Sequence, residues 1–189
     1  VAMCSAGALA DTLDHTYTPP GQYWNMENFP HWFAYEWNID LDLAPDEEIV
    51  SAELVIKNLR NWAVEDNDLY IHLLEGDDMN LGVTRYNDID SPSTPNDYFD
   101  GQGIMLVHYE DLGTTAETKT YPIVGAQLDT FKSYAADDVI GLGFDPDCHY
   151  YNDGITLTVD TSTMPEPGTA SLVLLATGCL TWIKRRGVV

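Results

Sequence analysis

The feature that most constrains the fold is an alternating run between Trp32 and Leu41. Large apolar side chains occupy every second position, and most of the positions between them are polar or charged. Because successive side chains of an extended strand point to opposite faces, this period of two predicts a half-buried β-strand. Its apolar face would consist of Phe33, Tyr35, Trp37, Ile39 and Leu41, and its polar face of Glu36, Asn38 and Asp40.

Further stretches of the sequence have the same strand-like character, because they are short, rich in β-branched and aromatic residues, and bounded by turn-forming residues. No rhythm of alternating strands and helices is visible, which favours an antiparallel sheet. One segment, residues 127–136, has apolar residues at helical spacing and predicts a short helix. We therefore expect an all-β, antiparallel, jelly-roll-like β-sandwich with one short helix, and an immunoglobulin-like sandwich is the alternative. The further predicted strands are residues 49–59, 69–74, 104–109, 118–123, 139–144 and 155–159.

The net charge of the chain excludes some classes of binding partner. The sequence contains 31 acidic and eight basic residues. All acids except Glu166 lie between Asp11 and Met164, whereas three of the bases lie near the C-terminus, so the segment 11–164 carries a net charge of −25. A field of this sign repels nucleic acid and anionic lipid, so no nucleic-acid partner is expected. Five tryptophans and eleven tyrosines supply apolar mass for a core, so we expect a folded domain.

Residues 1–10 are mostly small or apolar, carry no charge and end in Ala8-Leu9-Ala10. Signal peptidase requires small side chains at the third and first positions before its cut, so this pattern predicts the end of a secretory signal peptide with cleavage before Asp11. A lipoprotein signal ending at Cys4 is the alternative, but Met3 stands where a small residue is expected.

The C-terminal segment has three consecutive parts: the motif Pro165-Glu166-Pro167, an apolar run over residues 170–183, and the basic cluster Lys184-Arg185-Arg186. This order resembles the PEP-CTERM sorting signal of Gram-negative-type bacteria. Physically, the prolines keep the motif extended, the apolar run enters the membrane as a single C-terminal helix, and the bases hold its end in the cytoplasm. The resemblance implies recognition by an exosortase and delivery to the outer surface or the exopolysaccharide matrix.

These features divide the chain into the end of a signal peptide (residues 1–10), a β-sandwich ectodomain (11–163) and a sorting and anchor segment (164–189). The ectodomain and tail together look like small exported PEP-CTERM proteins with sandwich ectodomains, a resemblance that implies a fold class and no catalytic residue. Cys148 is the one cysteine of the ectodomain, so no internal disulfide is possible there. With His149 beside it, it supplies too few ligands for a zinc site.

Pairs of aspartates separated by one residue are the candidate metal ligands. In an extended chain the two side chains of such a pair point to the same side, and a hard cation such as Ca²⁺ readily occupies converging carboxylates. No pair has the spacing of an EF-hand loop, and solvated surface acids are the alternative interpretation. The candidate calcium ligands are Asp66 and Asp68 in one loop, and Asp145 and Asp147 in another, with Asp153 returning across a hairpin.

Catalysis is not expected, because the sequence lacks the common nucleophile and metalloprotease motifs and no pair of its acids stands out as a glycosidase pair. We expect an exported cell-envelope or extracellular-matrix protein with a structural or adhesive role. The alternative is a calcium-assisted carbohydrate-binding module for exopolysaccharide, with Trp62 at a strand end and Tyr98 in a proline-rich loop as the candidate exposed rings. Two or three coplanar exposed rings would favour sugar binding, and buried rings would favour a scaffold.

Overall fold

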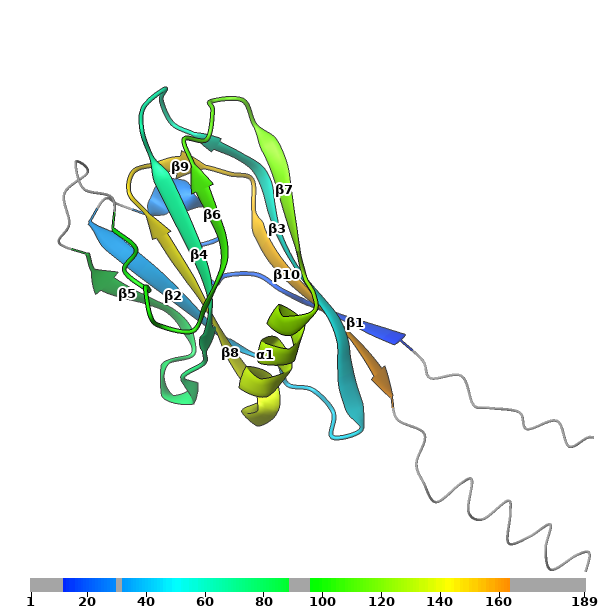
Figure 1. Ribbon diagram of the computed structural model, residues 1–189. Helices are drawn as coiled ribbons and strands as arrows, with labels where there is room; N and C mark the ends of the chain where they lie inside the picture. The colour runs from blue at the N-terminus through cyan, green and yellow to red at the C-terminus, as the bar shows by residue number, and fades with distance from the viewer. Residues whose placement is uncertain (1–11, 30–31, 89–95, 164–189) are drawn as a thin grey trace, which may run out of the picture.

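The computed structural model describes residues 12–29, 32–88 and 96–163. These residues form two antiparallel β-sheets that pack face to face, with one short α-helix near one end (Figure 1), so the predicted all-β sandwich and its single helix are confirmed. The predicted signal peptide end and the predicted membrane helix lie outside the described residues. Within the described ranges, no helix is long and apolar enough to cross a membrane.

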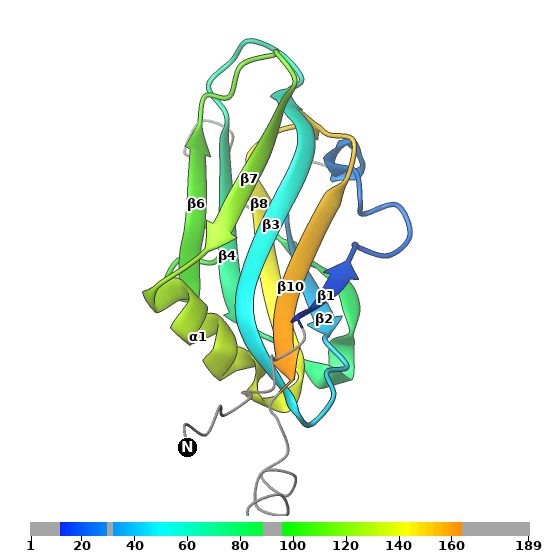
Figure 2. The same cartoon turned by 90° about the vertical axis from the view of Figure 1, so that its right-hand side faces the viewer.

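The first sheet has the strand order β1-β10-β3-β7, and Figure 2 shows it in front of the second sheet, which has the order β5-β2-β8-β4-β6. The strands of the first sheet are β1 (Thr12–Tyr17), β10 (Ile155–Thr163), β3 (Glu47–Asn61) and β7 (Glu117–Ile123), and the short β9 (Tyr150–Tyr151) pairs with the end of β3. The strands of the second are β5 (Gly82–Asn87), β2 (Phe33–Asp40), β8 (Val139–Pro146), β4 (Asp68–Glu75) and β6 (Ile104–Glu110). The helix α1 (Ala126–Tyr134) continues into the 3-10 turn η3 (Ala135–Asp137), and two further 3-10 turns are η1 (Met26–Asn28) and η2 (Asp78–Asn80).

The core fills the space between the two sheets. Alternate residues of each central strand point inward, as in Leu69, Ile71 and Leu73 of β4, so the period of two predicted the inner faces correctly. Phe131 of α1 and Phe29, which follows η1, are buried in the same core, and the Phe29 ring stacks on Tyr35 with 4.1 Å between centroids. Each such side chain contributes roughly 1.5–3 kcal/mol through burial.

The outer face of β2 is also covered, contrary to the prediction of a half-buried strand. Ala34 and Asn38 are buried on that face. Asn38 is covered by the connection between β4 and β5, where its Oδ1 accepts the backbone N–H of Asp77 and its Nδ2 donates to the carbonyl of Asn80. Ala34 is covered by the connection between β5 and β6, whose residues 96–103, here called the covering segment, lie over the sheet. Phe99 of this segment packs with Ala34 and Leu74. Gly143 of β8 makes room for it, because a Cβ at this position would lie 2.9 Å from the Phe99 ring.

Three strands, β1, β5 and β9, were not predicted from the sequence. β1 lies at the edge of its sheet and exposes most of its residues, so it has no apolar face to produce an alternating pattern. β5 begins at a glycine and has few apolar residues, and β9 has only two residues. Such strands are stabilised mainly by backbone hydrogen bonds to a neighbouring strand. Because these bonds do not require particular side chains, they produce no recognisable pattern in a single sequence.

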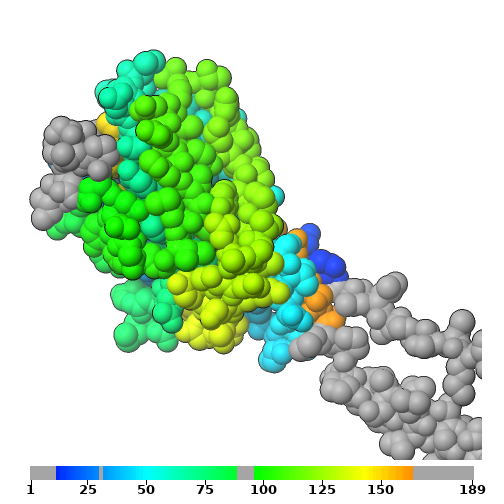
Figure 3. Space-filling model, in the orientation of Figure 1, coloured from blue at the N-terminus to red at the C-terminus, as the bar shows by residue number. Residues whose placement is uncertain are grey.

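The register of the strands defines two ends of the molecule. Thr12 lies opposite Ser162 and Thr163 opposite Glu47, so both ends of the described domain meet at one end, here called the proximal end. Figure 3 shows α1 beside the start of β3 at this end. The opposite, distal end carries β9, η1 and the connection from β3 to β4.

Candidate functional site

Three of the predicted calcium ligands lie near one another toward the distal end of the second sheet, without converging closely enough to form a ligand set by themselves. Asp68 begins β4, Asp145 lies in β8 and Asp147 follows directly after β8. Because β4 pairs with β8, the backbone N–H of Asp147 donates to the carbonyl of Asp68 at 3.0 Å. Two aspartate pairs that the sequence assigned to separate loops therefore contribute to one carboxylate cluster, defined here as Asp68, Asp145 and Asp147.

Asp145 has no exposed surface. Its Oδ2 accepts the backbone N–H of Tyr98 in the covering segment at 2.7 Å, and its Oδ1 has no hydrogen-bond partner among the described residues. Burial raises the pKa of Asp145 to about 7, and the nearby charges of Asp88, Asp147 and Asp97 add to the rise. The carboxyl group therefore changes protonation near neutral pH.

The pKa of Asp147 is also raised, by less than that of Asp145. Partial burial, followed by the charge of Asp68, raises the pKa of Asp147 to about 6. Asp68 is in turn bonded to His108 of β6, whose Nε2 lies 2.7 Å from its Oδ1. The His108 ring stacks on Tyr70, with 4.3 Å between centroids. The cluster is thus flanked by one imidazole that can balance part of its charge when protonated.

A second histidine holds the covering segment. His72 of β4 is buried, and its Nε2 lies 2.9 Å from Oδ2 of Asp97, whose Oδ1 accepts the backbone N–H of Phe99. The covering segment is therefore fixed to the sheet through Asp97, through Tyr98 on Asp145, and through the Phe99 ring over Gly143. It separates Asp145 from solvent.

The remaining predicted ligands lie elsewhere. Asp66 is exposed in the turn before β4. Asp153 lies in the hairpin before β10 on the other sheet, where its Oδ2 accepts the side-chain amide of Asn58 at 2.6 Å. The core between the sheets separates it from Asp145, so the expected return across the hairpin does not occur. In the ranges that the structure describes, no three His, Cys, Asp or Glu side chains converge closely enough to hold a metal ion.

The two candidate aromatic residues differ in their surroundings. Tyr98 is only partly exposed, because it stacks on Tyr86 with 5.5 Å between centroids and meets the edge of Phe99. Trp62 is 46% exposed at the distal end, where its Nε1 donates to Glu65 and its ring meets His149 edge-on. Trp62 therefore has an accessible ring, whereas much of the Tyr98 ring is occupied by its neighbours.

Cys148 is a partly buried thiol. Burial, followed by a hydrogen bond with Glu65, raises the pKa of the Cys148 thiol to about 11. In the absence of a metal the group is therefore protonated at neutral pH, which makes it a poor nucleophile.

No protein-family model matches this chain, and no curated protein matches it either.

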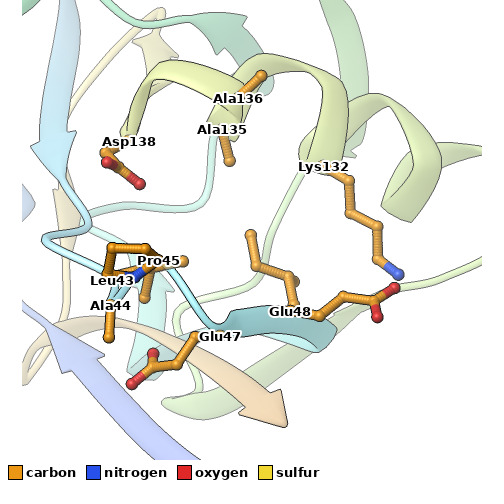
Figure 4. A pocket seen from close by; sticks show the side chains of 10 residues that line it. Leu43, Ala44, Pro45, Glu47, Glu48, Lys132, Ala135, Ala136 and Asp138 are labelled. Atoms are coloured by element: carbon orange, nitrogen blue, oxygen red, sulfur yellow. The ribbon is translucent and has the colours of Figure 1, made fainter. Parts of the chain in front are cut away.

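A pocket of about 540 Å³ lies at the proximal end, between α1 with η3 and the start of β3 (Figure 4). None of the predicted site residues lines it. The side chains of Lys132 and Glu48 lie on one side, and the apolar part includes Leu43, Ile49 and Ala135. It opens broadly to solvent and brings no nucleophile next to a base.

One group of side chains at the proximal end combines residue types found in hydrolases. His15 Nε2 lies 2.8 Å from Glu47 Oε2 and 3.3 Å from the hydroxyl oxygen of Thr161. A catalytic histidine uses one ring nitrogen for the nucleophile and the other for the carboxylate. Here both contacts involve Nε2, so the geometry does not fit nucleophilic catalysis.

Sequence reasoning missed three residues around the cluster. They are contributed by β4, β6 and the loop between β5 and β6, and no spacing in the sequence links them to the aspartate pairs. The one available clue was a buried-strand pattern interrupted by a histidine in β4. The missed residues are His72, Asp97 and His108. Asp88, whose charge also acts on Asp145, does belong to an aspartate pair of the sequence, with Asp90, but was not among the preferred ligands.

Proposed function

We propose that this chain is an exported, non-catalytic protein of the cell envelope or extracellular matrix, with a structural or adhesive role and sorting by an exosortase. The observation that carries the proposal is the pairing of β1 with β10, in which Thr12 lies opposite Ser162. The predicted cleavage site and the predicted sorting tail are thus joined to the same end of the sandwich. A domain attached in this way presents its distal end outward.

The proposed architecture is a jelly roll with two added strands, β5 and β9. Supporting this, the other eight strands form the orders β1-β10-β3-β7 and β2-β8-β4-β6. A jelly roll consists of eight antiparallel strands in two sheets built from two Greek keys. The chain also crosses between the sheets at β1 to β2, β2 to β3 and β3 to β4, as such a topology requires.

The proposal of a non-catalytic role is supported by the position of Asp145. A carboxyl group with a raised pKa is typical of a general acid, but a general acid must come within hydrogen-bonding reach of its substrate. Asp145 has no exposed surface, and the covering segment lies over it. Its burial fits a structural role better.

Sorting is tested by replacing Pro165, Glu166 and Pro167 together with alanine in the exporting host and fractionating the cells. We expect the variant to remain in the inner membrane, whereas wild type reaches the surface or matrix. A control with Thr169→Ala and Ser171→Ala alters the tail outside the motif and should be delivered normally. Unchanged delivery of the motif variant would refute the sorting proposal.

A second candidate function is calcium-assisted binding of exopolysaccharide. The observation that favours it is the carboxylate cluster, in which the buried Oδ1 of Asp145 has no partner among the described residues. A divalent cation bound between Asp145 and Asp147 would supply the missing counter-charge, with backbone carbonyls contributing to its coordination. The unfolding experiment in the Discussion tests this candidate.

A further inference from the structure

Three of the five tryptophans are about half exposed, and all three lie at the distal end. Trp24 is 45% exposed, Trp32 is 49% exposed and Trp62 is 46% exposed. Trp24 and Trp32 lie in the connection from β1 to β2, and Trp62 follows β3. Tryptophan is on average highly buried, so three accessible rings at one end of a small domain require an explanation.

Two of these tryptophans are attached to the same short stretch of chain. The side-chain amide of Asn152 donates to the carbonyl of Trp24 at 3.0 Å, and the backbone N–H of Trp62 donates to the carbonyl of His149 at 3.2 Å. Figure 1 shows the corresponding elements, η1 and β9, side by side at the distal end. Residues 149–152 therefore hold Trp24 and Trp62 on one part of the surface.

Trp32 is held at the same end by different means. Its carbonyl accepts the backbone N–H of Asp88 at 2.8 Å, and its φ angle is 72°. A bulky side chain rarely adopts this left-handed conformation, which persists only where surrounding contacts impose it. In the sequence, Trp24 and Trp32 flank a segment that contains Met26 and Phe29, both of which are buried in the core.

We propose that the distal end binds an uncharged polysaccharide, with pyranose rings stacked on Trp24, Trp32 and Trp62. This inference deepens the second candidate function above and rests on it. The rings supply flat apolar surfaces, and the exposed side chains of Glu65, Asp66 and Asp153 supply acceptors for sugar hydroxyl groups.

The charge of the domain decides between possible ligands. The segment 11–164 carries a net charge of −25, which repels anionic polysaccharides, nucleic acid and anionic membranes. The rings come from two connections, β1 to β2 and β3 to β4, and exposed carboxylates lie in the same end of the domain, whereas a protein-binding surface usually has an apolar centre depleted of charge. An uncharged glycan fits both the rings and the acceptors.

The test is native gel electrophoresis of the full 189-residue chain in a non-ionic detergent, with soluble polysaccharide cast into the gel. Mixed-linkage β-glucan and galactomannan are the uncharged probes, and alginate is the anionic probe. We expect at least one uncharged probe to retard the protein and alginate to leave its mobility unchanged. The double variant Trp24→Ala with Trp62→Ala should weaken the affinity about tenfold or more, and Trp62→Phe should retain most of it.

The matched control is Met79→Ala with Leu81→Ala, which removes exposed apolar side chains near the proximal end. It should bind as wild type, and circular dichroism should show all variants folded. Lack of retardation by either uncharged probe, retardation by alginate alone, or equal retardation of wild type and the tryptophan double variant would overturn the proposal. Because glycan binding is measured by gel mobility and the calcium site by the shift of Tm, failure of this inference is distinguishable from failure of the calcium-assisted function on which it rests.

Discussion

Asp145 accepts a hydrogen bond from the backbone N–H of Tyr98 at 2.7 Å, so a carboxylate without exposed surface holds the covering segment on β8. The same segment is fixed by Asp97 on His72 and by the Phe99 ring over Gly143. The ionisation of Asp145 therefore acts on the attachment of this segment as well as on the carboxylate cluster.

The first prediction concerns pH. Folding raises the pKa of Asp145 from 3.8 to about 7, so between these values the folded state binds more protons than the unfolded state. The contribution of Asp145 to the free energy of unfolding is therefore greatest below about pH 4 and declines as the pH rises to 7. Since one pKa unit corresponds to about 1.4 kcal/mol, the total decline is on the order of 4 kcal/mol.

Urea unfolding at pH 5 and pH 8 measures this decline. Asp145→Asn keeps the acceptor for the Tyr98 N–H and cannot ionise, so its free energy of unfolding should fall less than that of wild type between the two pH values. Asp66→Asn, at an exposed acid, should follow wild type. Equal pH dependence in wild type and Asp145→Asn would contradict the assignment.

The second prediction concerns calcium. A cation that binds only the folded state raises its stability by about 2.7 kcal/mol when present at about 100 times its Kd, which raises Tm by several degrees. We expect such a rise for wild type at pH 8 with millimolar calcium relative to chelator. Asp145→Asn with Asp147→Asn should abolish it, and Asp66→Asn with Asp153→Asn should not, since these acids lie outside the cluster. If calcium does not raise the Tm of wild type, the cluster does not bind calcium, and the acids of the domain contribute only mutual repulsion.

The third prediction concerns the packing of the covering segment. Gly143→Ala places a Cβ 2.9 Å from the Phe99 ring, so the ring must move away from Ala34 and Leu74. Overpacking of this kind costs about 1–3 kcal/mol. Gly113→Ala is the control, because nothing lies within 4 Å of its Cβ, and chemical denaturation should show little change in stability. Equal stabilities of the two variants would mean that the covering segment is not packed against β8.

Elements that pack on the continuous core have a hydrophobic periodicity in the sequence, whereas elements held by a few distant contacts do not. β2 was predictable because its inner residues face a continuous core, and α1 because Leu128 and Phe131 recur at helical spacing. Coverage of the outer face of β2 was not predictable, because it depends on Phe99 approaching a glycine in a distant strand.

The candidate site was predictable only in part, for the same reason. The aspartate pairs marked local concentrations of charge, yet the adjacency of Asp68 and Asp147 comes from pairing of β4 with β8. The burial that raises the pKa of Asp145 comes from the loop that contains Tyr98, 47 residues earlier in the sequence. Tertiary contacts of this range have no spacing that a single sequence reveals.

The last prediction concerns Asn152, which joins the β9 hairpin to the segment around η1. Its Oδ1 accepts the backbone N–H of Met26 at 2.7 Å, and its Nδ2 donates to the carbonyl of Trp24 at 3.0 Å. Asn152→Asp preserves the first bond but places an acceptor against the Trp24 carbonyl. Asn152 is buried, so this change should cost about 1–3 kcal/mol at pH 7.

Protonation of the introduced carboxylate would restore a donor to the Trp24 carbonyl, so the deficit of Asn152→Asp relative to wild type should shrink near pH 4. Asn25→Asp is the control, because the half-buried Asn25 side chain accepts the N–H of Glu27 and a carboxylate can do the same. Thermal unfolding at both pH values measures the effect. A deficit that stays constant with pH would mean that loss of the donor to Trp24 is not its cause, and the attachment of Trp24 to the hairpin would need another explanation.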